Sequence, residues 1–284
     1  MAAKAKKKTS FREALAAGEG FDLESLDKRS TPAFDGKKAD GQALLPELAD
    51  RASDLQERLY AEATAGGNRK VLLVIQGMDT SGKGGIMRHV VGAVDPQGTE
   101  ITAFKAPTKE ELSHHYLWRI RKALPHPGTI GVFDRSHYED VLIVRVRNLV
   151  PQEEWEGRYD EINAFEQELV DDDTTIIKVM LAISNEEQKD RLMSRLDRED
   201  KHWKFNPGDI DERKEWPDYM VAYQAAIDRC STDAAPWYVV PADRKWYARL
   251  AVMNLLIEHL TELDPQWPPA DFDVEEQRVR LAAT

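Results

Sequence analysis

The 284-residue chain contains 42% hydrophobic and 32% charged residues, and its formal net charge at pH 7 is −12. This composition is typical of a globular protein with a large buried core, and the acidic balance argues against general affinity for nucleic acid. No apolar stretch approaches the ~20 residues that span a bilayer. The single cysteine, Cys230, excludes a disulfide framework and a cysteine metal site. We therefore expect a cytoplasmic protein with no membrane or nucleic-acid partner.

The sequence pattern divides the chain into three regions. Residues 1–40 show little periodicity, and we expect them to form an irregular arm packed on the surface. The first residues of this arm are basic (Lys4, Lys6, Lys7 and Lys8) with no apolar segment after them, which favours disorder over a secretory signal. One domain is expected over residues 41–263, and a proline-rich, loosely held tail over 264–284.

Helix and strand signals alternate along the central region. The first helical pattern runs from Leu44 to near Gly66, with Pro46 in its first turn. Apolar or β-branched runs predict strands at 71–76, 99–104, 129–133, 174–183 and 237–240. Further helices are expected at 86–94, 108–124, 138–170 with a break at Pro151, 185–197, 212–229 and 243–263. This alternation predicts a three-layer α/β/α domain around a five-stranded parallel sheet, with ligands at the carboxyl ends of the strands.

The loop after the first strand carries the clearest chemical signal. Gly77, Gly82 and Lys83 have the spacing Gly-x-x-x-x-Gly-Lys, which is typical of a phosphate-binding loop between a strand and a helix. Glycines let backbone N–H groups close around an anion, and the lysine adds a positive charge. The residues expected to contact phosphate are Gly77, Thr80, Ser81, Gly82, Lys83, Gly84 and Gly85. The alternative is a glycine turn that binds nothing.

Two aspartates are candidates for a metal site. Gly84 replaces the Ser or Thr whose hydroxyl usually holds Mg²⁺ after the loop lysine, so another oxygen must take this role. Asp79 lies within the loop, and Asp134 ends an apolar strand, where a Walker B aspartate is expected. We predict that Asp79 and Asp134 hold one or two Mg²⁺ ions. A strand-end aspartate can also be only a turn residue or a helix cap.

Basic residues are expected at the same edge of the sheet. Arg135 follows the strand-end aspartate and is placed to reach a phosphate; its alternative is a salt bridge to a nearby carboxylate. A second basic series occupies the helix at 185–197 and the segment after it: Arg191, Arg195, Arg198, Lys201 and Lys204. Arginine forks suit phosphate oxygens, and many nucleotide kinases carry an arginine-bearing lid here. The interleaved acids Asp190, Asp197, Glu199 and Asp200 favour a solvated helix face as the alternative.

Motifs over roughly residues 40–260 resemble those of the type-2 polyphosphate kinases and occur in the family's order. They are Gly77–Gly85, Phe104–Thr108 with Leu117-Trp118-Arg119, Phe133–Val141, Lys201-His202-Trp203-Lys204, and Ala235-Pro236-Trp237 with Asp243 and Lys245. The resemblance implies a thymidylate-kinase-like phosphotransferase domain over 41–263 with a helical lid at about 185–210. It implies reversible phosphoryl transfer between inorganic polyphosphate and purine nucleotides, dependent on Mg²⁺ with Mn²⁺ as an alternative.

The same resemblance assigns roles to individual positions. The metal aspartates of the family match Asp79 and Asp134, and its catalytic cations match Lys83, Arg135 and Arg195. A basic polyphosphate channel is implied along the loop, lined also by Arg119, Arg191, Lys201 and Lys204. Tyr138 and Glu139 are expected at the nucleotide, because the form Tyr-Glu-Asp-Val resembles class III, whose members accept mono- and diphosphates. A homo-oligomer, dimer or tetramer, is implied as well.

Other functions stay open on the sequence. One is a nucleotide kinase with ATP as donor, although the missing hydroxyl at Gly84 argues against it. Another is a non-catalytic scaffold that binds nucleotide or polyphosphate, although the paired aspartates and lid arginines argue against that. Within the family, an enzyme that accepts diphosphates only is the alternative to a dual acceptor.

Overall fold

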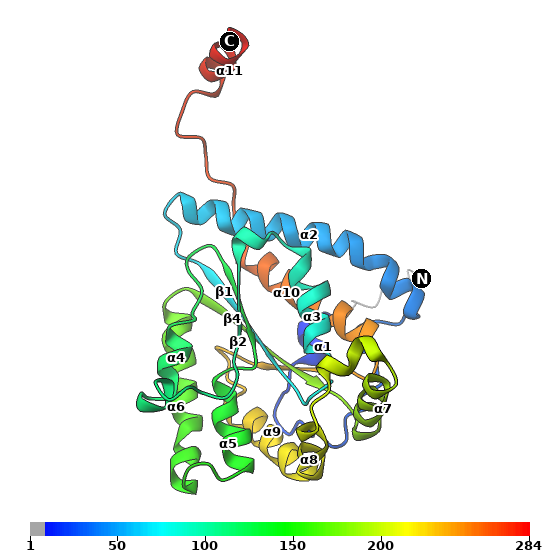
Figure 1. Ribbon diagram of the computed structural model, residues 1–284. Helices are drawn as coiled ribbons and strands as arrows, with labels where there is room; N and C mark the ends of the chain where they lie inside the picture. The colour runs from blue at the N-terminus through cyan, green and yellow to red at the C-terminus, as the bar shows by residue number, and fades with distance from the viewer. Residues whose placement is uncertain (1–8) are drawn as a thin grey trace, which may run out of the picture.

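The computed structural model describes residues 9–284, so the basic segment Lys4–Lys8 lies outside the described residues. A five-stranded sheet crosses the middle of the molecule with helices on both faces (Figure 1). All strand pairs are parallel, in the order β2-β3-β1-β4-β5. The strands are β1 (Lys70–Gln76), β2 (Thr99–Ala103), β3 (Ile130–Asp134), β4 (Thr174–Ala182) and β5 (Trp237–Pro241). The predicted parallel sheet and its five strands are confirmed.

Helices form one layer on each side of the sheet. The first layer consists of α1 (Phe11–Leu15), α2 (Lys38–Thr64), α3 (Lys83–His89) and α10 (Lys245–Leu263). The second consists of α4 (Leu117–Arg121), α5 (Ile143–Val146), α6 (Gln152–Asp171) and α9 (Trp216–Cys230). Beyond one edge lie α7 (Asn185–Leu196) and α8 (Gly208–Lys214), and α11 (Val274–Ala282) ends the chain (Figure 1).

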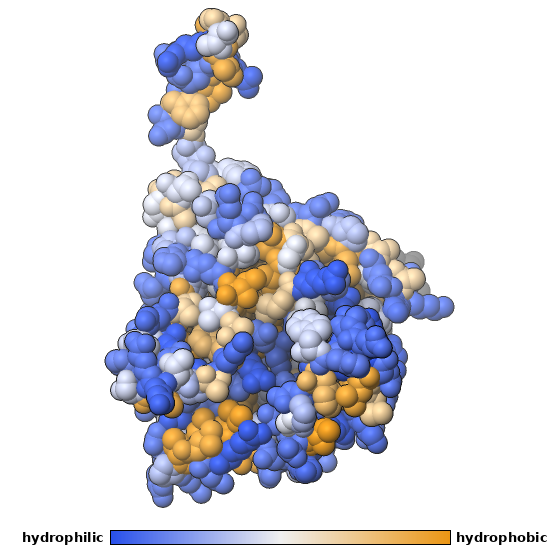
Figure 2. Space-filling view, in the orientation of Figure 1, coloured by the Kyte–Doolittle hydropathy of each residue, from blue (hydrophilic) through white to orange (hydrophobic). Residues whose placement is uncertain are grey.

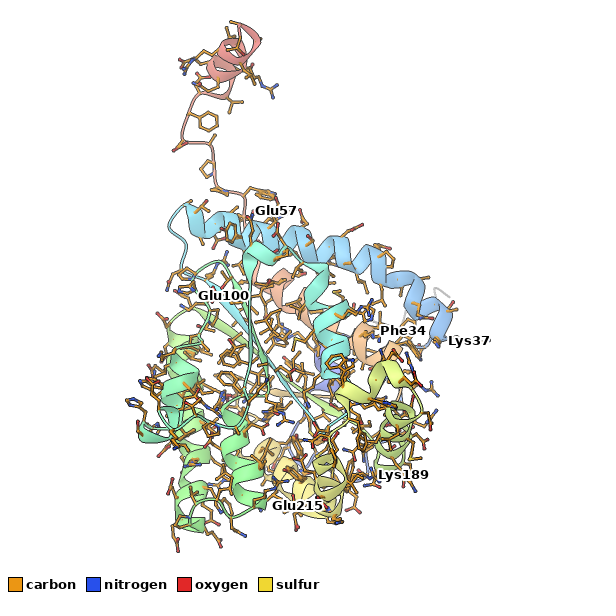
Figure 3. The ribbon with its side chains drawn as sticks, in the orientation of Figure 1. Phe34, Lys37, Glu57, Glu100, Lys189 and Glu215 are labelled. Atoms are coloured by element: carbon orange, nitrogen blue, oxygen red, sulfur yellow. The ribbon has the colours of Figure 1, made fainter. Side chains whose placement is uncertain are left out.

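Two hydrophobic cores explain why the central strand is apolar throughout. In β1, Val71, Leu73 and Ile75 face the first helix layer, whereas Leu72 and Val74 face the second. This alternation follows from the two-residue repeat of a strand, and burial on both faces removes any need for polar positions. Figure 3 shows side chains filling the space between the sheet and both helix layers.

The N-terminal region is more ordered than the predicted irregular arm over 1–40. Ser10 and Glu13 form a reciprocal capping box that starts the short helix α1. Phe11 and Leu15 of this helix are buried in the first core. The next helix, α2, begins at Lys38 and not at Leu44, so Pro46 lies inside it instead of in its first turn. The rest of the described arm, residues 16–37, contains no helix or strand, as predicted, whereas the predicted helix start at Leu44 was too late.

Three predicted helices are divided in the structure. Before the predicted break at Pro151, the pattern at 138–170 forms a 3-10 helix at 137–141 and the four-residue α5. The capping box of Thr108 and Glu111 forms, with N···O distances of 2.6 and 3.2 Å, but it opens only a single 3-10 turn before α4. Leu112 of that turn is 69% exposed, so no apolar contact propagates the helix. The pattern at 212–229 breaks at Glu215, because Pro217 lacks the N–H that would continue α8 into α9.

The C-terminal tail leaves the body as an extended segment after Asp264 and ends in α11 (Figure 1). No residue of α11 is buried, and Figure 2 shows apolar side chains of the tail standing clear of the body. The large apolar side chains exposed here are Trp267, Phe272, Val274, Val279 and Leu281. Across residues 9–284, no helix combines the length and apolarity that a membrane crossing requires.

A buried histidine links α10 to the edge strand β5. His259 is 5% exposed, its Nδ1 lies 2.7 Å from the Leu255 carbonyl oxygen, and its Nε2 lies 3.1 Å from the Tyr238 hydroxyl. Burial lowers the pKa of His259 to about 4, because the imidazolium loses its hydration. A histidine in the unfolded chain binds a proton below about pH 6.5. Stability carried by neutral His259 is therefore present above this value and is lost as the pH falls.

We predict that His259→Gln flattens the acid limb of the stability profile. Between about pH 6.5 and pH 4 the unfolded wild-type chain binds more protons than the folded one, which costs up to about 3 kcal/mol at this site. Urea unfolding at several pH values measures the slope for both proteins. An identical slope in wild type and variant would contradict the prediction, whatever the difference in stability at neutral pH.

Candidate active site

Two cavities open at the carboxyl edge of the sheet. The first, of about 470 Å³, surrounds the loop between β1 and α3 and is called the phosphate-loop cavity. The second, of about 600 Å³, lies between the end of β2, α4, α5, α6 and the 3-10 helix η4 (His137–Val141). Both cavities are placed by the parallel register, in which Ile75 of β1 pairs with Asp134 of β3. This pairing brings the loop after β1 beside the end of β3.

Most of the predicted phosphate-binding set lines the phosphate-loop cavity. It brings together Asp79, Thr80, Ser81, Gly82, Lys83, Gly84, Gly85, Asp134, Arg191, Arg195, Lys201 and Lys204. The loop that starts at Gly77 needs glycine, because Gly77 has φ 149° and a Cβ there would lie 2.8 Å from the Leu181 carbonyl oxygen. The predicted meeting of the loop with the basic series at one cavity therefore occurs in the structure.

Lys83 begins α3 and faces this cavity. Its Nζ donates to the Gly77 carbonyl oxygen at 2.7 Å, within the loop itself. Burial, helped by the neighbouring Arg135, lowers the pKa of Lys83. The helix that follows ends at His89, so it starts three residues earlier and is shorter than the predicted helix at 86–94.

The two aspartates provide a donor set that suits a hard divalent cation. Asp79 and Asp134 both line the phosphate-loop cavity. Burial opposes ionisation of Asp79, but Lys83 and Arg135 outweigh it and lower its pKa, so the group stays a carboxylate. No cluster of three or more His, Cys, Asp or Glu side chains in residues 9–284 forms a complete metal cage. Two carboxylates fit Mg²⁺ or Mn²⁺ that takes its remaining ligands from phosphate oxygens and water.

Arg135 connects the two cavities. Its Nη2 donates to Asp79 Oδ1 at 3.0 Å, and its Nη1 lies 3.9 Å from Glu139 Oε2. Arg135 itself lines the second cavity, whereas Asp79 lines the first. Burial opposes its charge, but Glu139 and Asp79 outweigh this and raise its pKa further. The salt bridge expected as an alternative for Arg135 is therefore present, and it places the guanidinium between the two cavities.

The second cavity combines apolar walls with charged groups. Aromatic and aliphatic side chains from Phe104, Tyr116, Ile143 and Val144 form part of its lining. Its charged groups are Lys105, Glu111, Arg119, Arg135, Glu139, Asp140, Glu154, Arg158 and Glu161. Such a mixture is typical of a site for a small organic ligand with a charged end.

Arg119 lies in this second cavity and not along the phosphate loop. Its Nη1 donates to the Lys105 carbonyl oxygen at 2.9 Å, and its guanidinium lies 5.4 Å from the centre of the Phe104 ring. The structure thus separates Arg119 from the predicted polyphosphate-binding set, because α4 packs on the opposite helix layer from α3.

Arg191 faces the phosphate-loop cavity, but its donors are fully engaged within the protein. A guanidinium carries five N–H groups. They reach Glu187 Oε1 at 2.8 Å and four carbonyl oxygens, those of Thr80 (2.8 Å), Ser81 (2.9 Å), Ala242 (2.7 Å) and Asp243 (3.0 Å). In this structure the side chain therefore positions the loop, and phosphate binding by Arg191 stays a prediction.

Tyr138 lines neither cavity, so the structure does not bring its side chain together with Glu139. The side chain is fully buried, and its hydroxyl lies 2.9 Å from Glu166 Oε1 and 2.8 Å from Lys178 Nζ in the second core. Its neighbour Glu139 has a side chain only 16% exposed and lines the second cavity. Adjacent residues of a short helix point in different directions, which the sequence motif alone does not reveal.

Several residues at the site were not predicted from the sequence. Arg88 from α3 and Lys245 and Arg249 from α10 extend the basic lining of the phosphate-loop cavity. On α8, burial and the nearby Asp79 raise the pKa of Glu212 to about 7. Arg88 lies five residues after the loop lysine on the same short helix, so the sequence could have indicated it. The α10 residues lie far away in sequence and enter the cavity only through the fold.

The fold and this site define a phosphate-loop phosphotransferase class of protein: a parallel sheet, a glycine-lysine loop, two strand-edge aspartates and a cationic cavity. The family model described as Polyphosphate kinase 2 (PPK2) matches residues 35–268. The chain belongs to the polyphosphate kinase 2 family.

Individual relatives agree with this assignment. The chain is 47% identical over 248 residues to the AMP/ADP-polyphosphate phosphotransferase of Meiothermus ruber, covering 87% of this chain and 91% of that protein. It is 40% identical over 263 residues to the ADP-polyphosphate phosphotransferase of Rhodopseudomonas palustris, covering 88% and 89%. The crystal structure of polyphosphate kinase 2 from Arthrobacter aurescens matches with a TM-score of 0.96 and 53% identity over the full length of both chains.

We predict that Arg191→Met lowers the free energy of unfolding by about 2–4 kcal/mol, because four carbonyl groups and Glu187 lose a buried partner. Arg198→Met is the matched control. Its guanidinium lines the same cavity but bonds only the exposed Asp200, so less than about 1 kcal/mol should be lost. Denaturant unfolding measures both. Equal losses in the two variants would show that Arg191 does not tie the loop to its surroundings.

Proposed function

We propose that this protein transfers the terminal phosphoryl group of inorganic polyphosphate to AMP and to ADP, reversibly and with Mg²⁺. The observation that carries the proposal is the pair of adjoining cavities joined by Arg135, one cationic and one partly apolar. The names of the Meiothermus ruber and Rhodopseudomonas palustris relatives, AMP/ADP-polyphosphate phosphotransferase and ADP-polyphosphate phosphotransferase, support the same reaction.

The phosphate-loop cavity suits a long inorganic polyanion. Its carboxylates are those of Asp79 and Asp134, whereas its cations are Lys83, Arg88, Arg191, Arg195, Arg198, Lys201, Lys204, Lys245 and Arg249. Arg195 makes one ordinary hydrogen bond, from Nη1 to the Lys204 carbonyl oxygen at 3.0 Å, and one long contact from the same nitrogen to Asp209 Oδ2 at 3.5 Å, so fewer of its donors are engaged. Its guanidinium is therefore available to a phosphate chain, unlike that of Arg191. An excess of fixed cations favours a donor with many phosphate groups over a single nucleotide.

The second cavity suits the acceptor. Its apolar wall accommodates a nucleoside, and Arg135 lies at the side that adjoins the phosphate loop, where the acceptor phosphate would meet the donor. The name of the Meiothermus ruber relative and the class III-like motif around Glu139 support a dual mono- and diphosphate acceptor. Arg119 supplies a second cation for the acceptor phosphates.

In this reaction the residues of the site contribute alignment and charge. An acceptor phosphate oxygen, ionised near neutral pH, bonds to the terminal phosphorus of polyphosphate. The bond from that phosphorus to its bridging oxygen breaks, and the shortened polyphosphate keeps this oxygen. No general base is needed, so the residues align two anions and offset their repulsion. Asp79 and Asp134 would hold Mg²⁺, which supplies charge neutralisation at the phosphate oxygens. Lys83 and Arg135 hold the two phosphate groups in line.

We expect the purified protein, Mg²⁺ and long-chain polyphosphate to yield ADP and ATP from AMP, and ATP from ADP. Asp134→Asn should lower turnover about 100-fold or more because a metal ligand is lost. Asp190→Asn, which changes an exposed carboxylate of α7 outside the cavity, is the control and should be fully active. Chromatography of the nucleotides measures the products from AMP and from ADP for the wild type and both variants.

Each outcome of this assay decides between the alternatives. ATP formed from ADP alone would exclude the dual acceptor. Product only with ATP as donor would favour an ordinary nucleotide kinase, and no product from a folded sample would favour a binding scaffold. Full activity of Asp134→Asn would remove Asp134 from the site.

We also propose that the protein is a cytoplasmic homo-oligomer. Support for assembly comes from the tail, where Trp267 (50%), Phe272 (57%) and Leu281 (76%) are exposed and the nine-residue α11 is too short to be stable alone. Light scattering of the full chain should give a multiple of the monomer mass. Phe272→Ser with Leu281→Ser should weaken the assembly, and a monomeric wild-type protein would contradict the proposal.

A further inference from the structure

A buried ion pair lies beneath the second cavity, away from any ligand surface. Lys178 of β4 is 0% exposed and Glu166 of α6 is 1% exposed, with Nζ 2.5 Å from Oε2. Neither residue lines either cavity. Burying two charges is expensive, and well-packed apolar side chains often serve stability as well or better. The pair therefore calls for an explanation other than stability.

Further hydrogen bonds to η4 and α9 surround the ion pair. Lys178 Nζ also reaches the Tyr138 hydroxyl oxygen at 2.8 Å and the Cys230 carbonyl oxygen at 2.6 Å, so all three ammonium protons have acceptors. Glu166 Oε1 accepts from the Tyr138 hydroxyl at 2.9 Å and lies 3.2 Å from His137 Nε2. Burial opposes the charge of Glu166, but Lys178 outweighs it and lowers the pKa of the carboxyl.

The segment held in this way carries charged groups to the second cavity. Within η4, His137 and Tyr138 point into the core, while Glu139 and Asp140 line the cavity. A 3-10 helix of five residues has weak internal hydrogen bonds and little rigidity of its own. Arg158 holds Asp140 at 2.8 Å, whereas the side chain of Glu139 meets Gln76 and forms only a loose ion pair with Arg135, at 3.9 Å. The position of Glu139 therefore depends on its anchored neighbour, Tyr138.

We propose that Lys178 and Glu166 are positioning residues for nucleotide recognition, which hold η4 through Tyr138 and His137 so that Glu139 and Asp140 meet the acceptor. The inference rests on the proposed function of the second cavity. A rigid ionic anchor fixes direction as well as distance, which an apolar contact does not. Small displacements of positioned groups cost a large share of binding and rate.

The main test is the double variant Lys178→Met/Glu166→Met, which removes both charges together and leaves no unpaired ion. Its KM for ADP should rise about tenfold, the equivalent of about 1.4 kcal/mol. Its KM for polyphosphate should change less than about twofold, because the phosphate-loop cavity is untouched. Tyr138→Phe removes one hydroxyl and should shift the KM for ADP in the same direction.

Lys70→Met is the matched control. Lys70 is also buried. It lies at the start of β1, away from the phosphate loop, and its Nζ donates to Asp172 Oδ2 at 2.8 Å. The Lys70→Met variant should be less stable than the wild type, with unchanged KM values for ADP and for polyphosphate. An unchanged KM for ADP in the folded double variant would overturn the inference, as would equal rises for both substrates, which mark general loosening.

Direct binding separates the inference from the proposed function. Calorimetry should show that the double variant binds ADP about tenfold more weakly than the wild type does. This result would support the positioning role even if the wild type transferred no phosphate, an outcome that would contradict only the proposed transfer reaction. Equal ADP affinity in both proteins overturns the positioning role. A wild-type protein that binds no ADP overturns the positioning role and the proposed acceptor site together.

Discussion

The site depends on one arginine that joins three separate parts of the chain. Arg191 stands on α7, the first helix of the predicted lid, and its guanidinium bonds carbonyl oxygens of the phosphate loop and of the junction between β5 and α10. Buried carbonyl groups need partners, and here a single side chain satisfies four of them. The loop, the lid helix and the base of α10 are therefore held in one arrangement. This connection helps to keep the cations of α7 and α10 facing the same cavity.

A strongly cationic cavity in a protein of net charge −12 is a local arrangement. Its basic residues come from α3, α7, the segment after α7 and α10, which converge at the carboxyl edge of the sheet. Acidic residues of the same helices, such as Asp190 and Glu199, do not line the cavity. The solvated-face alternative considered for α7 thus holds for one side of the helix, while the other side faces the site. A polyanion is then attracted at one place and repelled elsewhere.

Sequence reasoning located the sheet, the loop and both aspartates because these features are local. β1 is apolar over its whole length, the loop has a fixed spacing, and Asp134 directly follows an apolar run. Side-chain direction and long-range contact are not local. The basic spacing placed Arg191 on the correct helix face but could not show its five acceptors. Tyr138 and Glu139 are neighbours in one motif, yet one lies in the core and the other at the cavity. Arg249 reaches the site only through the packing of α10.

Backbone conformation at the site adds a constraint that no residue type reveals. Thr80 and Arg135 both have positive φ, 62° and 65°, although neither is glycine. Each such conformation costs on the order of 1–3 kcal/mol and persists only where neighbours enforce it. At Thr80 the carbonyl group is held by Arg191, and at Arg135 the N–H donates to the Ile75 carbonyl oxygen at 3.1 Å. Both residues turn where the phosphate-loop cavity adjoins the second. Two of the six non-glycine residues with positive φ in residues 9–284 thus line the cavities, and the surrounding contacts offset their strain.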